Sequence, residues 1–184
     1  TASLKVQDAA APPRSVTILG ATGSIGLRTL DLIARNPSRF TVEAVTANSS
    51  VQELAELAIR HNARCAVLAD ESGYADLKQA LTGSGVEARA GRAALIAIAG
   101  EPVDFLMAGI VGSAGLEPTL AAIRQGTDVG LANKECLVCA GDLFLQEVRK
   151  SGSHLLPVDS EHNAIFQVFE TERAEQVARI VLTA

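Results

Sequence analysis

A loop with glycine at every third position, Gly20, Gly23 and Gly26, is the feature that most constrains how this chain folds. It follows an apolar run typical of a buried strand and precedes a segment with helical spacing. In such a unit the first glycine permits a tight turn, the second lets a phosphate approach the backbone, and the third lets helix and strand pack closely. The free N–H groups near Ser24 and Ile25 then face the phosphates. The spacing predicts a dinucleotide-binding loop, and a plain turn between strand and helix is the alternative.

Short β-rich runs alternate with helical stretches from residue 14 to residue 134. Strands joined through helices of this length pair in parallel. We therefore expect an α/β fold with a doubly wound, mostly parallel, Rossmann-like sheet. In the first helix, Ile25, Thr29, Leu32 and Ile33 are spaced to share one face.

Composition narrows the class of protein. The formal net charge of −5 argues against the broad basic footprint of a nucleic-acid binder. No apolar run approaches the length of about 18 residues that would indicate a membrane span. The three cysteines, Cys65, Cys136 and Cys139, are too few and too unevenly spaced for a disulfide scaffold, and they favour a reducing cytoplasm.

The residues after the second expected strand decide which dinucleotide fits. An Asp or Glu there binds the ribose 2′-hydroxyl of NAD, whereas a neutral or basic pocket accepts the 2′-phosphate of NADP. This chain has Ala47, Asn48, Ser49 and Ser50 at that place. Their amide and hydroxyl groups can donate to a phosphate, and no carboxylate opposes it. We therefore expect NADP, with Ser50 also capping the following helix.

The segment LANKE ends a predicted strand at the sheet edge where α/β proteins place their ligands. Its Lys134 can donate a charged hydrogen bond to an anionic substrate or to a developing oxyanion. A lysine at a helix start opposes the helix dipole, which favours a functional role over a solvated surface role. Asn133 can cap the helix.

The segment PVDSEHN is the densest polar cluster in the chain. If it is extended, Asp159 and Glu161 point to the same side, and the neighbouring His162 points elsewhere. Two carboxylates so placed suit Mg²⁺ or Mn²⁺, with further ligands from other groups. The alternative is a helix start, with Asp159 or Ser160 as N-cap and Glu161 in the first turn. The spacing alone leaves both interpretations open.

Four motifs, in this order and spacing, carry a resemblance that covers nearly the whole chain: TILGATGSIG, AGIVGSAGLEPTLAAI, LANKE and LLPVDSEHNAIFQ. The sequence resembles the N-terminal part of the 1-deoxy-D-xylulose 5-phosphate reductoisomerase family. The resemblance implies an oxidoreductase of non-mevalonate isoprene biosynthesis. Such an enzyme converts 1-deoxy-D-xylulose 5-phosphate, a small phosphorylated sugar, to 2-C-methyl-D-erythritol 4-phosphate with NADPH and Mg²⁺ or Mn²⁺. It also implies a homodimer in the bacterial cytoplasm.

The resemblance assigns roles to residues that match the family motifs. Substrate would contact Lys134 and Ser160, and the metal ligands would be Asp159 and Glu161, which form the catalytic set together with Lys134. The residues expected to touch the cofactor are Gly20, Thr22, Gly23, Ser24, Ile25, Ala47, Asn48, Ser49, Ser50, Ala108, Asn133 and Glu135. Where the family usually has a glycine and a basic residue, this chain has Asn48 and Ser49.

Three segments are expected along the chain. Residues 1–13 form a disordered tail, residues 14–150 an NADP-binding Rossmann-like domain, and residues 151–184 the beginning of an α+β catalytic domain. The strand-like last run, residues 177–184, suggests a fragment. The resemblance implies that a third acidic metal ligand and the phosphate-binding residues lie beyond Ala184. Two alternatives are another NADP-dependent dehydrogenase, of the aspartate-semialdehyde or homoserine type, and a nucleotide-binding module without catalysis.

Overall fold

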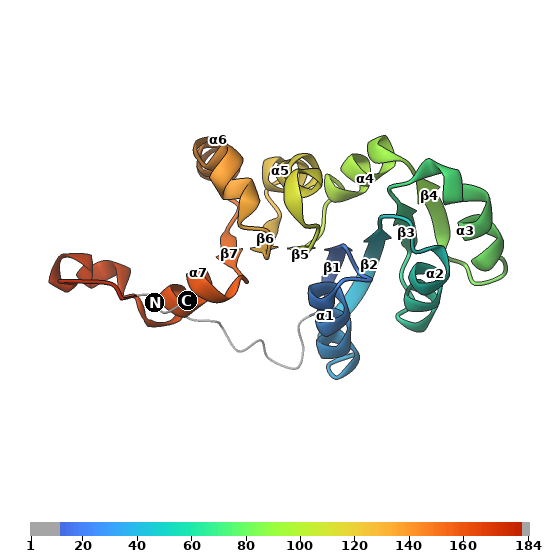
Figure 1. Ribbon diagram of the computed structural model, residues 1–184. Helices are drawn as coiled ribbons and strands as arrows, with labels where there is room; N and C mark the ends of the chain where they lie inside the picture. The colour runs from blue at the N-terminus through green and yellow to red at the C-terminus, as the bar shows by residue number, and fades with distance from the viewer. Residues whose placement is uncertain (1–11, 182–184) are drawn as a thin grey trace.

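Residues 12–181 are described by the computed structural model, in which the strands form one seven-stranded sheet (Figure 1). The order is β4-β3-β2-β1-β5-β6-β7, and every neighbouring pair is parallel. The strands are β1 Arg14–Leu19, β2 Phe40–Ala47, β3 Cys65–Leu68, β4 Glu87–Ala90, β5 Phe105–Ala108, β6 Asp128–Leu131 and β7 Leu155–Pro157. The predicted doubly wound α/β fold is confirmed, although most of the expected tail, residues 1–11, lies outside the described residues.

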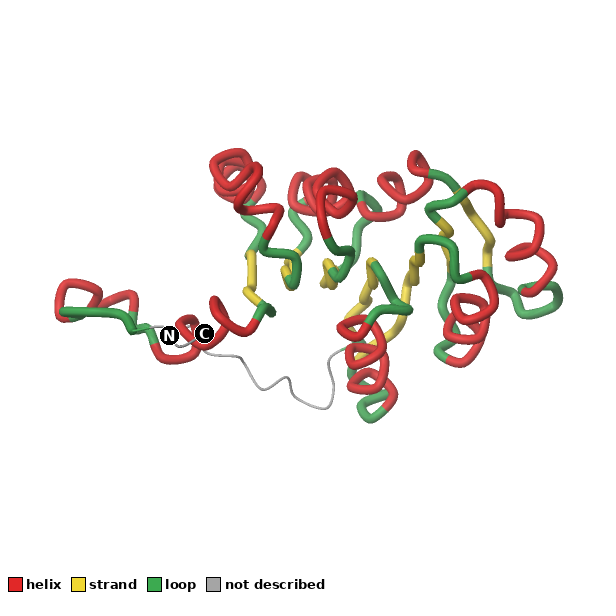
Figure 2. The backbone as a smooth tube through the Cα atoms, viewed as in Figure 1, coloured by secondary structure: helices red, strands yellow, loops and turns green. Residues whose placement is uncertain are grey.

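Helices cover both faces of the sheet, and the strands run between them (Figures 1 and 2). The helices are α1 Ser24–Ala34, α2 Val51–Arg60, α3 Tyr74–Ala80, α4 Arg92–Ala99, α5 Leu116–Gln125, α6 Glu135–Ser151 and α7 Ser160–Val168, with short 3-10 helices η1 Glu71–Gly73, η2 Gly112–Gly115 and η3 Thr171–Gln176. One apolar layer joins α1, α2 and α3 to the sheet, and a second joins α4, α5 and α6 to its other face.

The buried face of α1 differs from the expected one. Gly26, Leu30 and Ile33 are buried, whereas Leu32 is 61% exposed. The buried residues are four and three positions apart and so form one stripe on the helix. Leu32 falls beside that stripe, because each residue turns the helix by about 100°. The prediction that Leu32 shares the core face was wrong.

The sheet reverses its winding between β1 and β5. From β1 the chain builds β2, β3 and β4 outward on one side, and then returns to add β5, β6 and β7 on the other. Because all strands are parallel, their carboxyl ends meet at one edge, with a crevice at the reversal point. That edge holds the expected cofactor and substrate residues.

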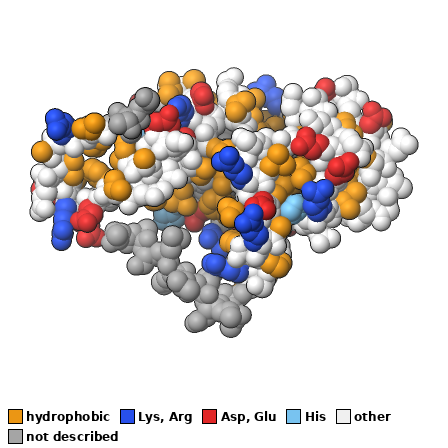
Figure 3. All heavy atoms as spheres, turned by 60° about the horizontal axis from the view of Figure 1, so that its bottom comes forward, with side chains coloured by type: hydrophobic (Ala, Val, Ile, Leu, Met, Phe, Trp, Pro, Cys, Tyr) orange, Lys and Arg blue, Asp and Glu red, His pale blue; other side chains and the backbone are white. Residues whose placement is uncertain are grey.

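The last part of the described chain leaves the sheet. Helix α7 and η3 extend away from it (Figures 1 and 2), and apolar side chains reach the surface over this segment (Figure 3). Residues 177–181 form no strand with any described part of the chain, so the strand expected there was wrong for these residues. Their backbone finds no neighbouring strand to pair with, and an apolar sequence becomes a strand only when a ladder partner satisfies its hydrogen bonds. Among residues 12–181, no helix combines the length and apolarity needed to cross a membrane.

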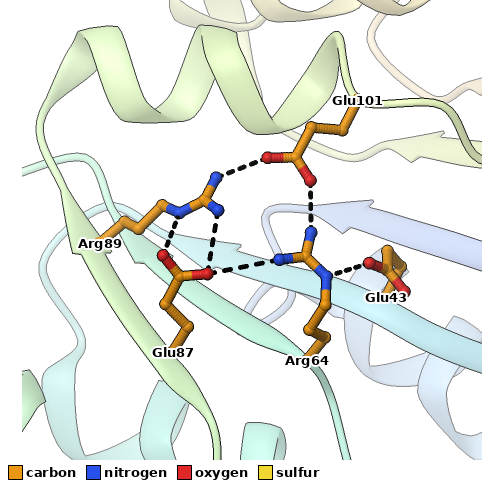
Figure 4. Close-up of polar contacts among 5 residues, drawn as sticks. All are labelled: Glu43, Arg64, Glu87, Arg89 and Glu101. Carbon is orange, nitrogen blue, oxygen red and sulfur yellow. Dashed lines mark hydrogen bonds and ion pairs between the residues drawn. The ribbon is translucent and has the colours of Figure 1, made fainter.

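A network of five charged side chains joins the middle of β2, the start of β3, the strand β4 and the turn after α4 (Figure 4). Arg64 pairs with Glu43, with Glu101 and, at 3.3 Å, with Glu87. Arg89 contacts Glu87 at 2.8 Å and Glu101 at 2.6 Å. Glu87 and Glu101 are thus each shared between two guanidinium groups. A network of this kind stabilises a fold more than isolated surface pairs do.

Replacing Arg64 with methionine (Arg64→Met) is expected to lower the free energy of unfolding by about 1–2 kcal/mol, because three carboxylates lose a partner. Urea titration at neutral pH measures this. The matched control is Arg35→Met, which removes a single exposed pair with Asp31 on α1 and should cost no more than about 0.5 kcal/mol. Equal losses in the two variants would contradict the cooperative role of the network.

The difference in unfolding free energy between Arg64→Met and the parent chain should shrink in acid. The pKa of Glu87 lies below its ordinary value mainly because of the hydrogen bond from Arg89, against a smaller opposing effect of burial, and the charge of Arg64 lowers it further. A lowered folded-state pKa gives stability that is complete above the unfolded-state pKa of about 4.3 and is lost as the pH falls through the folded value. The unfolding free energies of Arg64→Met and the parent chain should therefore converge in that range.

Candidate functional site

The glycine loop follows β1 at the reversal point of the sheet. Gly20 has φ +77°, and a Cβ there would lie 3.0 Å from the backbone of Gly109, which follows β5. The Gly109 N–H in turn donates to the carbonyl of Leu19 at 2.9 Å. The buried Thr46 of β2 holds the other side: its Oγ1 accepts from the Gly20 N–H at 3.0 Å and its carbonyl accepts from the Ala21 N–H at 2.7 Å. Only glycine meets both the positive φ and the close approach at position 20.

Helix α1 begins directly after Gly23, its N-cap. The first backbone bond of the helix joins the Leu27 N–H to the Gly23 carbonyl at 2.9 Å. The N–H groups of Ser24, Ile25 and Gly26 therefore have no partner within the helix. No side chain in the described part of the chain caps this end, so the N–H groups and the positive end of the helix dipole remain available for a phosphate. Thr22, half-buried, and Ser24, exposed, stand at the same place.

The turn after β2 is neutral. Asn48, Ser49 and Ser50 are exposed, whereas the Ala47 side chain is buried and can offer a ligand only its backbone. Ser50 is the N-cap of α2 as predicted, but its side chain makes no capping hydrogen bond, which leaves its hydroxyl available. The Asn48 carbonyl accepts from the Asp70 N–H at 2.9 Å, so the turn is fixed from the neighbouring strand end.

The loops that follow β5 and β6 lie side by side at the carboxyl edge of the sheet. Ala108, the last residue of β5, is buried, and its carbonyl accepts from the Ala132 N–H at 3.1 Å. Asn133 is also buried, and its Oδ1 accepts from the Glu135 N–H at 3.1 Å. The prediction that Asn133 caps the following helix was wrong in position: Lys134 is the N-cap residue of α6, and Asn133 precedes it while accepting from the first helical N–H. Glu135 itself is exposed.

The structure brings LANKE and PVDSEHN together. Lys134, at the start of α6, reaches Glu161 in the first turn of α7, with Nζ 3.2 Å from Oε1. The two strands that precede them, β6 and β7, pair with each other, and the Val158 N–H donates to the Leu131 carbonyl at 2.9 Å. The ion pair therefore follows from the sheet register rather than from sequence proximity. Ser160 lies exposed beside it.

The extended arrangement considered for Asp159 and Glu161 was wrong, and the helix start is what forms. Asp159 is the N-cap of α7, and its Oδ1 accepts from the His162 backbone N–H at 3.0 Å. The His162 imidazole Nδ1 lies 2.8 Å from the same oxygen. Burial alone would raise the pKa of Asp159, but the hydrogen bonds from His162 and the charge of Lys134 hold the pKa below its ordinary value. The carboxylate is thus ionised at neutral pH.

The Glu161 carboxylate is ionised for a related reason. Its own backbone N–H and the Lys134 ammonium lower its pKa. Two ionised carboxylates on one helix start are oxygen ligands of the kind that Mg²⁺ prefers. No cluster of three or more metal-ligating side chains occurs within residues 12–181 as described. The residues present therefore fit part of a divalent-metal site, which needs other oxygen ligands to be complete.

An open pocket of about 760 Å³ lies beside the carboxylates, between α6, β7 and α7. Asp159 and His162 stand on one side of it, and most of the lining is apolar, including Leu137, Phe166 and Phe169. No Lys or Arg of residues 12–181 lines it. Because a phosphate site needs cationic or N–H donors, this pocket does not suit the phosphate of a substrate.

Two contributors to the site were missed from the sequence, and for a third, His162, the expectation that it points away from Asp159 was wrong. Thr46 holds the glycine loop, His162 orients Asp159, and Gly115 leaves room beside Asn133. The spacing of Asp159 and His162, three residues apart at a helix start, was a usable signal for His162. The other two depend on contacts between distant segments, for which a single sequence carries no signal.

Comparison with known proteins agrees with the geometry. A family model described as 1-deoxy-D-xylulose 5-phosphate reductoisomerase matches residues 16–141, and a model of the C-terminal domain of the same enzyme matches residues 155–184. The reductoisomerase of Rhodospirillum centenum is 57% identical over 171 residues, which cover 93% of this chain and 42% of the relative. The chain thus spans less than half the length of this relative.

Two solved structures are similar over 88% of the chain. The reductoisomerase of Zymomonas mobilis in complex with NADPH has a TM-score of 0.85 at 60% identity, and the chain covers 42% of it. A reductoisomerase in complex with NADPH, fosmidomycin and magnesium has a TM-score of 0.82 at 43% identity, and the chain covers 40% of it. With its glycine loop, its paired carboxylates and these matches, the chain belongs to the 1-deoxy-D-xylulose 5-phosphate reductoisomerase family.

Proposed function

We propose that this chain supplies the NADPH-binding part, and a portion of the metal and substrate site, of an enzyme that converts 1-deoxy-D-xylulose 5-phosphate to 2-C-methyl-D-erythritol 4-phosphate. The observation that carries the proposal is the juxtaposition at one sheet edge of the glycine loop, Lys134 and the two carboxylates of α7. Membership of the family favours this function over the dehydrogenase alternatives.

The cofactor would lie across the carboxyl ends of β2, β1 and β5. The free N–H groups of Ser24 and Ile25 would bind its pyrophosphate, and Ser49 and Ser50 its 2′-phosphate. The backbone after Ala108 would run along the nicotinamide half, with Asn133 and Glu135 nearby. The similar Zymomonas mobilis structure contains NADPH, which supports this choice of dinucleotide.

The substrate would lie between the nicotinamide and α7. Asp159 and Glu161 would hold a Mg²⁺ ion, for which Mn²⁺ is the expected substitute, and Lys134 and Ser160 would donate to substrate oxygens. When bound, the ion would polarise the ketone during rearrangement, and NADPH would supply the hydride that reduces the resulting aldehyde. Lys134 would have to leave Glu161 to reach the substrate, and the exposure of both side chains, 47% and 41%, allows that movement.

The wider setting follows from the same family. We propose a role in non-mevalonate isoprenoid biosynthesis, in the cytoplasm of a bacterium, as a homodimer. Residues 151–184 would then begin the catalytic domain, while β7 completes the nucleotide-binding sheet.

The test is turnover by the complete enzyme, meaning this chain together with the remainder present in its relatives. With 1-deoxy-D-xylulose 5-phosphate and Mg²⁺, NADPH oxidation is expected, and a chelator should stop it. Because no carboxylate follows β2, kcat/KM with NADPH should exceed that with NADH by at least about tenfold, the effect of one lost charged contact. Metal-independent turnover would contradict the metal role, and equal kcat/KM values would contradict the 2′-phosphate site.

A further inference from the structure

We propose that Asn133 is a positioning residue, which clamps the loop after β5 to the start of α6 instead of binding cofactor with its side chain. The inference rests on the proposed function for its consequence but not for its geometry. Asn133 was expected to touch the cofactor, yet only 3% of it is exposed. Its hydrogen bonds show what the side chain does.

All the hydrogen-bond donors of the Asn133 side chain are already used. An amide group has two donors, and here Nδ2 donates to the Ile110 carbonyl at 2.6 Å and to the Gly112 carbonyl at 2.7 Å. On its other side Oδ1 accepts from the Glu135 N–H at 3.1 Å. The amide therefore has no donor left for a ligand oxygen. It joins two loops that are more than twenty residues apart in sequence.

The surrounding backbone is shaped around this amide. A Cβ on Gly115 would lie 3.0 Å from Asn133 Nδ2 and 2.8 Å from the Ile110 carbonyl oxygen. Gly112, which accepts the second bond, has φ +69°. A larger residue at position 115 would push the amide and the loop apart. Gly115 thus makes room for the buried amide, and Gly112 supplies the positive φ of the loop that accepts its second bond.

The clamp links the two halves of the proposed chemistry. One side of it holds residues 109–112, along which the nicotinamide would lie, and the other holds the N–H that follows Lys134. Fixing these two segments to each other sets the distance between the hydride donor and the substrate lysine. Such pre-organisation matters because small displacements of reacting groups slow a reaction strongly.

The experiment uses hydrogen exchange of the chain without cofactor, followed by peptide mass spectrometry. Asn133→Asp keeps the shape and the acceptor oxygen but places a second oxygen against two carbonyls. Amides of residues 109–117 are expected to exchange at least about tenfold faster, because a buried network loses two bonds. Gly115→Ala should give the same local effect without altering Asn133. Asn36→Asp is the matched control, since Asn36 donates to a single carbonyl, that of Leu32, at the far end of α1.

A second measurement separates positioning from general loss of structure. Each variant is titrated with NADPH and with 2′-phospho-ADP-ribose, which lacks the nicotinamide. We expect about tenfold weaker binding of NADPH and less than about twofold change for the shorter ligand, because only the nicotinamide half lies over the clamp. Equal losses for both ligands would overturn the positioning role.

Unchanged exchange of residues 109–117 in both Asn133→Asp and Gly115→Ala would also overturn it. Failure of the unaltered chain to bind NADPH would instead count against the proposed function. In that case hydrogen exchange alone decides the clamp, because it needs no ligand.

Discussion

Gly26→Ala is expected to lower the free energy of unfolding by about 3 kcal/mol or more and to abolish measurable NADPH binding. A Cβ at position 26 would meet the Gly20 carbonyl oxygen and lie 2.5 Å and 2.7 Å from Cα and C of Ala21. These are backbone atoms held by Thr46 and by the β1–β5 junction, so neither side can yield without distorting the phosphate loop. Overpacking of this kind against rigid neighbours reaches the upper end of measured costs. Urea titration and NADPH fluorescence measure the two effects.

Gly141→Ala is the matched control, because a Cβ there would meet nothing within 4 Å. In the helix α6 that substitution should leave stability unchanged or raise it by up to about 1 kcal/mol. Gly20→Ala tests the same loop through backbone strain as well as contact, since Gly20 has φ +77°. If Gly26→Ala retained the stability and NADPH affinity of the parent chain, the close packing of helix and loop would have no functional importance.

The roles of the glycines could be predicted because they are local. A strand, a loop and a helix succeed each other within some twenty residues. The spacing of Gly20, Gly23 and Gly26 therefore predicts the tight turn, the approach of a phosphate to the backbone and the close packing of helix and strand. The parallel sheet was predictable for a similar reason, since short strands joined by helices have few alternative arrangements. Leu32 shows the limit of this reasoning. Apolar character does not say on which side of a stripe a residue falls.

The candidate site was less predictable because its contacts join distant segments. Lys134 meets Glu161 only because β6 and β7 pair in register. The bonds of Asn133 to Ile110 and Gly112 cross between the loops after β5 and β6. Their spacing predicted that these residues lie at one sheet edge, but the partner of each side chain could be identified only from the structure. The strand predicted over residues 177–181 was wrong because an apolar pattern does not show whether a partner strand is present, and the described chain offers none.

Asp159→Asn in the complete enzyme is expected to reduce metal-dependent turnover by about a thousandfold, while NADPH affinity stays within about twofold of the parent. The expected loss follows from the several kcal/mol that a divalent ion contributes to polarising an oxygen, at about 1.4 kcal/mol for each factor of ten. Asparagine caps a helix as well as aspartate does, so α7 should keep its start. Steady-state kinetics at varied Mg²⁺ and calorimetric titration with Mn²⁺ measure the loss of turnover and of metal affinity.

Asp128→Asn provides a closely matched control, because Asp128 repeats the local geometry of Asp159 at the opposite edge of the sheet. Its Oδ1 accepts from the His154 backbone N–H at 2.9 Å and lies 2.8 Å from His154 Nδ1. The substitution removes the same charge beside the same kind of partner, but at the amino end of β6. Turnover and Mn²⁺ affinity should stay within about twofold of the parent, since surface charge changes of this kind have small effects at a distance. Equal behaviour of Asp159→Asn and Asp128→Asn would show that Asp159 is a helix cap and not a metal ligand.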